Sequence, residues 1–99
     1  MRRGTTPTFV FTLPMNATEL AAGFVTFAQG TNVVIDKPLS EWKIDGNKVT
    51  IDLSQQETLC LDAGCNAEIQ MRVRTKSGRA LATNITSVPA ERILKDGEI

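Results

Sequence analysis

The chemistry open to this chain is limited by the residue types that it lacks. Its 99 residues include no histidine and no tyrosine, which excludes every mechanism that needs an imidazole as base, acid or metal ligand. Paired carboxylates are the catalytic option that is left, because glycoside hydrolysis needs two acids in one cleft. The acids expected at turns or on polar strand faces are Asp36, Asp45, Asp52, Asp62, Glu68 and Asp96. Since these are solvated positions, we expect no enzyme activity, no catalytic residue and no cofactor.

Two cysteines, Cys60 and Cys65, are the only thiols of the chain. In a reducing cytosol we expect both to be free. A disulfide is the alternative, if the turn at residues 62–64 brings the two side chains together. A metal site would need two further ligands of a suitable kind, and no histidine is present to supply them. We therefore expect no metal site.

A row of cations follows one face of an expected strand at Arg72, Arg74 and Lys76. Alternate residues of a strand lie about 6.8 Å apart, so these side chains would form a basic ridge. The ridge suits a carboxylate-rich partner, and the alternative is a solvated face balanced by Glu68 and other acids. The formal net charge is zero, from 11 basic and 11 acidic residues, which argues against general nucleic-acid binding and against an anionic membrane surface. We keep Arg72 and Arg74 as candidate protein contacts.

The carboxyl-terminal segment, residues 90–99, follows the last expected strand and mixes charged with apolar residues. An apolar side chain on such a tail either packs back onto a sheet edge or docks on another copy of the chain. Arg92, Ile93 and Leu94 are therefore further candidate protein contacts. Residues 1–5 are expected to form a flexible arm. No apolar run long enough for a signal peptide or a membrane span follows Arg2 and Arg3, so we expect a cytosolic protein.

The elements that must position these residues are strands, because hydrophobic residues alternate with a period of two. The strands are expected at residues 6–13, 23–28, 32–37, 41–45, 48–53, 66–76 and 80–88. Glycine-containing turns at Gly30, Gly46 and Gly78 join three hairpins. Ser54 and Glu57 have the spacing of a capping box for a single helical turn. Residues 1–99 thus predict one all-β domain, a seven-stranded antiparallel immunoglobulin-like β-sandwich.

The aromatic residues of this sandwich are expected in its core. Trp42 shares the parity of Ile44 on one face of its strand, and we expect it to anchor the core. The four phenylalanines fall on alternating positions that are also expected to face inward. Leu81 and Ile85 share parity in the last strand, which predicts that both point to the same face.

Several segments resemble small proteins encoded in prophages and in phage structural-gene clusters. The segments that carry the resemblance are residues 2–14, 25–29, 42–51, 68–82 and 92–97. The chain is similar, more distantly, to the immunoglobulin-like amino-terminal domain of phage baseplate upper proteins, which anchors receptor-binding parts to the tail tip. This resemblance implies a non-enzymatic tail or baseplate accessory that acts by protein–protein contact. It carries no catalytic residues.

The expected partners are other phage structural proteins and further copies of this chain, because virion parts repeat. The protein would then be a virion component assembled in the bacterial cytoplasm, without nucleic acid or membrane as a partner. Two alternatives stay open. The first is a carbohydrate-binding or host-recognition module that uses an exposed aromatic platform, and the second is a small nucleic-acid-binding factor that uses the basic strand face at residues 72–79.

Overall fold

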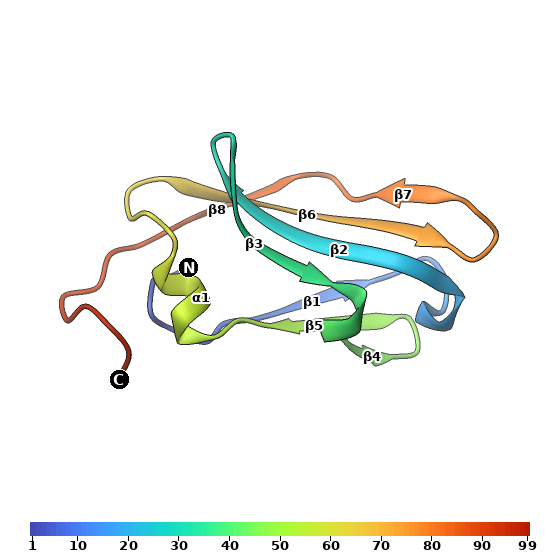
Figure 1. The fold of residues 1–99 in the computed structure, drawn as a ribbon, viewed down its shortest axis with the longest axis horizontal. Coiled ribbons are helices and arrows are strands. Elements are labelled where there is room, and N and C mark those ends of the chain that lie inside the picture. Colours follow the sequence, from blue (N-terminus) through green and yellow to red (C-terminus); the bar gives the residue numbers. More distant parts are fainter.

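The computed structural model describes all residues from 1 to 99 and shows two antiparallel β-sheets stacked on each other (Figure 1). The smaller sheet has three strands in the order β1 (Thr8–Thr12), β5 (Lys48–Asp52) and β4 (Lys43–Asp45). The larger sheet begins with β3 (Asn32–Pro38), β2 (Leu20–Gln29) and β6 (Asn66–Thr75). Both β7 (Ala80–Ala82) and β8 (Thr86–Pro89) pair with β6. The all-β class is therefore confirmed.

The alternating pattern of the sequence explains the strands. In β6 the buried side chains are those of Ala67, Ile69, Met71 and Val73, and the residues between them point outward. Residues two apart in a strand face the same side, so this alternation places one face of β6 on the core and the other in solvent.

The strand count is eight rather than the expected seven, because the segment at residues 80–88 is broken. Arg72 pairs with Ala82 but Ile69 pairs with Thr86, so residues 83–85 lie opposite only two residues of β6. The extra residue is a bulge, and it reverses the alternation beyond it. The expectation that Ile85 faces the same side as Leu81 is consequently wrong, and Ile85 is 58% exposed.

The core lies between the two sheets and contains large side chains from both. Phe27 of β2 meets Phe9 of β1 edge to face, with ring centroids 5.3 Å apart. Trp42 is buried as expected, and its indole Nε1 donates a hydrogen bond to the carbonyl oxygen of Lys37 at 2.9 Å. The expectation that every phenylalanine faces the core is wrong for Phe24, which is 47% exposed on the outer side of β2.

The helices are short and lie at the ends of strands. The 3-10 helices are η1 (Ala17–Glu19) and η2 (Leu39–Glu41), and the single α-helix is α1 (Gln55–Leu59). The expected capping box of α1 is confirmed, since the Ser54 hydroxyl accepts from the Glu57 N–H and the Glu57 carboxylate accepts from the Ser54 N–H. The Lys37 ammonium lies 2.7 Å from the Glu57 carboxylate and ties β3 to α1. None of the helices has the length and hydropathy needed to cross a bilayer.

The two ends of the chain lie against each other at one end of the molecule. The Glu91 N–H donates to the Met1 carbonyl at 2.8 Å, and the Arg3 N–H donates to the Glu91 carbonyl at 3.1 Å. Residues 1–5, expected as a flexible arm, therefore have backbone partners in the tail. Cys60 and Cys65 are free and exposed in the structure.

Candidate functional site

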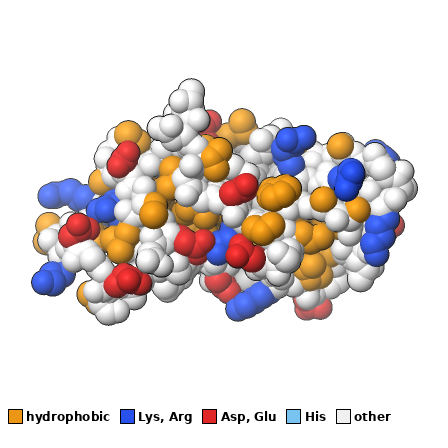
Figure 2. All heavy atoms as spheres, in the orientation of Figure 1, with side chains coloured by type: hydrophobic (Ala, Val, Ile, Leu, Met, Phe, Trp, Pro, Cys, Tyr) orange, Lys and Arg blue, Asp and Glu red, His pale blue; other side chains and the backbone are white.

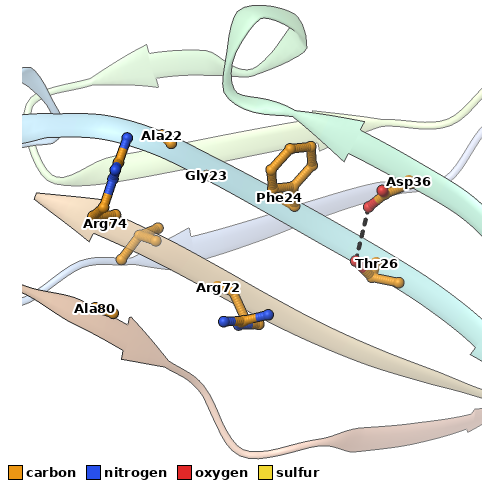
Figure 3. A pocket seen from close by; sticks show the side chains of 9 residues that line it. Ala22, Gly23, Phe24, Thr26, Asp36, Arg72, Arg74 and Ala80 are labelled. Atoms are coloured by element: carbon orange, nitrogen blue, oxygen red, sulfur yellow. Dashed lines mark hydrogen bonds between the residues drawn. The ribbon is translucent and has the colours of Figure 1, made fainter.

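The outer face of the five-stranded sheet holds a shallow hollow beside Arg72 and Arg74, two of the candidate contacts. Phe24 lies opposite Arg72 across the β2–β6 ladder, and Ala22 lies opposite Arg74. The hollow measures about 370 Å³, and Figure 3 shows side chains from β2, β3, β6 and β7 around it. We call this surface the contact face and define it by Ala22, Phe24, Thr26, Asp36, Arg72, Arg74 and Ala80.

A close fit beneath β2 positions Phe24. Gly23 is the buried neighbour of Phe24, and a Cβ atom built on it would lie 2.5 Å from Cη2 of Trp42. The missing side chain of Gly23 thus lets the indole pack directly under the backbone of β2. Phe24 comes directly after Gly23 in the alternating pattern of β2, so its side chain lies on the opposite, outer face of the strand.

The charges of the contact face are not paired within the chain. The five ion pairs of the structure join other groups, so Arg72 and Arg74 are both without an acidic partner within 4.0 Å. Glu68, the acid named with the alternative of a solvated face, forms no ion pair either. Asp36 accepts a hydrogen bond from the Thr26 hydroxyl at 2.8 Å, shown as a dashed line in Figure 3. The face thus offers two free guanidinium groups next to one oriented carboxylate.

An exposed aromatic ring beside arginines is typical of protein interfaces. Aromatic residues and arginine are enriched there, since a ring supplies large apolar area and a guanidinium supplies several hydrogen-bond donors. Figure 2 shows basic side chains next to hydrophobic ones on the part of the surface over β2, β6 and β7. The arrangement can therefore bind a partner that has an apolar patch and carboxylates.

The titrating groups with shifted pKa values are all held in their charged forms. A hydrogen bond between the side chains of Lys43 and Asp52 raises the pKa of Lys43 and lowers that of Asp52. Burial acts to raise the pKa of Glu57, but hydrogen bonds from Lys37 and from Ser54 outweigh it and lower the pKa. A residue suited to general acid–base catalysis has instead a pKa that is shifted toward the working pH. No three His, Cys, Asp or Glu side chains lie together in a way that could hold a metal ion.

The candidate contacts of the sequence fall at two separate places. Arg72 and Arg74 lie on the contact face, whereas Arg92, Ile93 and Leu94 lie in the tail at the opposite end of the molecule (Figure 1). Ile93 is half-buried, and its Cδ1 lies 3.0 Å from the place where a Cβ on Gly4 would be. Leu94 is 91% exposed. The tail therefore packs on its own chain through Ile93 and leaves Leu94 free.

The sequence analysis did not identify Phe24 as a residue of this site. The signal that could have found it is Gly23, a glycine in the middle of a strand pattern, which often marks a close approach of another group. Trp42 is that group, and its position is decided by packing between elements far apart in the sequence.

Comparison with known proteins adds no family to this description. No protein-family model matches the chain, and no curated protein or solved structure was found to match it. The fold and the site together define a class, a small two-sheet antiparallel β protein with a mixed aromatic and cationic face.

Proposed function

We propose that this protein is a non-enzymatic structural component of a phage or prophage particle, acting as a tail or baseplate accessory by protein–protein contact. Its fold would be the immunoglobulin-like form of the β-sandwich, and it would be assembled into the virion in the bacterial cytoplasm. The resemblance of its strand and hairpin segments to phage structural proteins supports its membership of a phage particle. The contact face supports action by protein–protein contact.

The observation that carries the proposal is the exposure of Phe24 beside two arginines that have no acidic partner. Nearly half of the Phe24 side chain is exposed at 47%, and its neighbours on the outer side of β2 are the small residue Ala22 and the polar residue Thr26. A protein partner would remove this ring from water and satisfy the guanidinium groups of Arg72 and Arg74 with carboxylates. Such central aromatic and arginine residues supply most of the binding energy in measured interfaces.

The burial of Trp42 weighs against the carbohydrate-binding alternative. Trp42 is 7% exposed, so the single tryptophan of the chain cannot serve as an exposed stacking platform. The nucleic-acid alternative depends on the basic strand face, where Arg72 and Arg74 lie beside Asp36. A carboxylate at that place would repel phosphate, which makes a carboxylate-bearing protein the better partner.

Particle incorporation is the experiment that tests the proposal. A tagged full-length chain is expressed in the strain that carries the gene, particles are purified on a density gradient, and the copy number of the chain is measured by quantitative mass spectrometry. The wild-type chain is expected at a constant number of copies per particle. For the double variant Phe24→Ser with Arg72→Glu, the copy number per particle is expected to fall by about tenfold or more, because each lost contact of this kind costs more than about 1 kcal/mol of binding free energy.

A matched control separates the contact face from exposed apolar surface in general. Val33 is 62% exposed on β3, outside the hollow, so Val33→Ser should leave the copy number unchanged. Circular dichroism of each purified variant checks that it folds. Absence of the wild-type chain from purified particles would overturn the assignment to a virion, and equal incorporation of the double variant would overturn the contact face.

A further inference from the structure

The edges of the two sheets differ in how they are protected against pairing with another chain. Exposed edge strands are normally blocked by charge, proline, a bulge or short length. The edge strand β3 carries Asp36, Lys37 and Pro38 and has an irregular register beside Phe27. β4 has three residues, two of them charged, and β7 has three residues before the bulge that separates it from β8.

β1 has none of these protections along its length. Its five residues read Thr-Phe-Val-Phe-Thr, and no charged residue occurs between Arg3 and Glu19. Val10, at the centre of the strand, is 62% exposed. The only prolines near it, Pro7 and Pro14, lie outside the strand. A regular, uncharged edge of this kind is a template for strand addition.

The backbone groups that β1 offers follow from its register with β5. The Leu53 N–H donates to the Pro7 carbonyl at 3.1 Å, and the Leu13 N–H donates to the Asn47 carbonyl at 2.7 Å. Hydrogen-bonded pairs alternate along an antiparallel ladder, so the odd-numbered residues of β1 bond to β5. Thr8, Val10 and Thr12 consequently point three N–H and three C=O groups away from the sheet.

The sequence of β1 is a palindrome centred on Val10, which suits pairing of the strand with its own copy. We propose that two copies of this chain join β1 to β1 in antiparallel register, with a two-fold axis at Val10. Thr8 then lies opposite Thr12, Phe9 opposite Phe11, and Val10 opposite Val10 of the second copy. Each copy donates three backbone hydrogen bonds and accepts three. Threonine pairs and aromatic pairs are among the favourable cross-strand pairs.

The surroundings of β1 fit a second copy as the occupant. A groove of about 350 Å³ opens between β1 and the edge formed by β8 and the bulge before it, and Phe9, Phe11, Ile69 and Val88 line it. In a two-fold pair the grooves of both copies lie on the same side of the joined sheet, so each helps to cover the other.

No like charges meet across the joined edge. Asp52 pairs with Thr8 and Lys48 pairs with Thr12 in the three-stranded sheet. In the proposed register Thr8 of one copy lies opposite Thr12 of the other. The residues beyond them on β5 are Asp52 in the first copy and Lys48 in the second, which have opposite charges. The β1 edge shares no residue with the contact face, so an experiment can refute the proposal for one surface and leave the proposal for the other standing.

Sedimentation of the full chain tests the β1 pairing. The wild-type chain is expected to form a dimer in analytical ultracentrifugation at micromolar concentration. Val10→Lys places two ammonium groups opposite each other at the two-fold axis and should raise the dimer dissociation constant by about tenfold or more. Val33→Lys is the matched control, because Val33 is also 62% exposed but lies on β3, and it should leave the constant unchanged.

Cysteine cross-linking tests the register itself. In a background with Cys60→Ser and Cys65→Ser, the variant Val10→Cys should oxidise to a covalent dimer, because Cα atoms of a hydrogen-bonded pair lie about 5.5 Å apart and a disulfide spans that distance. Val33→Cys in the same background should stay monomeric. A wild-type chain that is monomeric up to millimolar concentration, a Val10→Lys dimer as tight as wild type, or equal cross-linking of both cysteine variants would overturn the proposal.

Discussion

The packing of Trp42 against Gly23 makes a sharp prediction about stability. The added methyl group of Gly23→Ala would lie 2.5 Å from Cη2, 3.1 Å from Cζ2 and 3.2 Å from Cζ3 of the indole ring. Such contacts are too short to persist, so the ring or the backbone of β2 must shift. Since Gly23 is not among the glycines with positive φ, alanine fits the backbone there, and the cost arises from the indole alone.

Two opposing effects set the size of the change. Inserting a methyl group into a packed core destabilises a protein by about 1–3 kcal/mol. Replacing glycine by alanine where the backbone allows it stabilises by about 0.4–1 kcal/mol, because the unfolded chain loses freedom. We therefore expect Gly23→Ala to lower the free energy of unfolding by about 1–2 kcal/mol, which corresponds to a fall in Tm of about 4–16 °C for a domain of this size.

A double-mutant cycle with Trp42→Phe is the assay. The atoms that approach position 23 belong to the far ring of the indole, which phenylalanine lacks. In the Trp42→Phe background Gly23→Ala should consequently raise stability by about 0.4–1 kcal/mol, so the sign of its effect reverses. Urea unfolding is followed by circular dichroism, because Trp42 is the single tryptophan of the chain and its replacement removes the fluorescence signal. A Gly23→Ala change of the same sign and size in both backgrounds would refute the reasoning.

Three further changes test other parts of the structure by urea unfolding. Glu57→Gln should make the loss of stability in acid smaller. The pKa of Glu57 is held below 4.5 in the folded protein, so its carboxylate adds stability above pH 4.5 that is lost as the pH falls through the pKa of the folded state. An unchanged dependence of stability on pH would contradict this. Gln29→Leu should cost about 1–3 kcal/mol, since the buried amide donates to the Asp62 carbonyl at 2.9 Å and accepts from the Asp62 N–H at 2.8 Å; a change below about 0.5 kcal/mol would argue against it. Removing residues 94–99 should change the free energy of unfolding by less than about 0.5 kcal/mol, because Leu94 and Ile99 are 91% and 95% exposed; a larger loss would show that the tail supports the fold.

The site could be predicted from the sequence only in part. The alternation of residues 66–76 places Arg72 and Arg74 on the outer face of β6, as the structure has it. That these arginines lie beside Phe24 depends on the pairing of β6 with β2, which joins residues that are 48 positions apart. No periodicity within one segment contains that pairing.

The bulge at residues 83–85 could not be predicted from the sequence either. Thr83 lies where the register between β6 and the last two strands changes, and its hydroxyl accepts a hydrogen bond from the Met71 N–H at 3.0 Å. That bond stands in for a ladder bond between backbones, so the break depends on a side chain from one strand and an amide from another. It turns Ile85 outward and makes two strands out of one.

The sequence by itself determined the β class, most strand segments, the glycine turns and the capping box of α1, because each depends on residues within a few positions of one another. The tertiary structure alone decided which strands pair, where the ladder bulges, how Trp42 fits over Gly23 and which edge stays open at β1. These features depend on contacts between distant segments, whose geometry is set by the joint packing of both sheets rather than by any local preference.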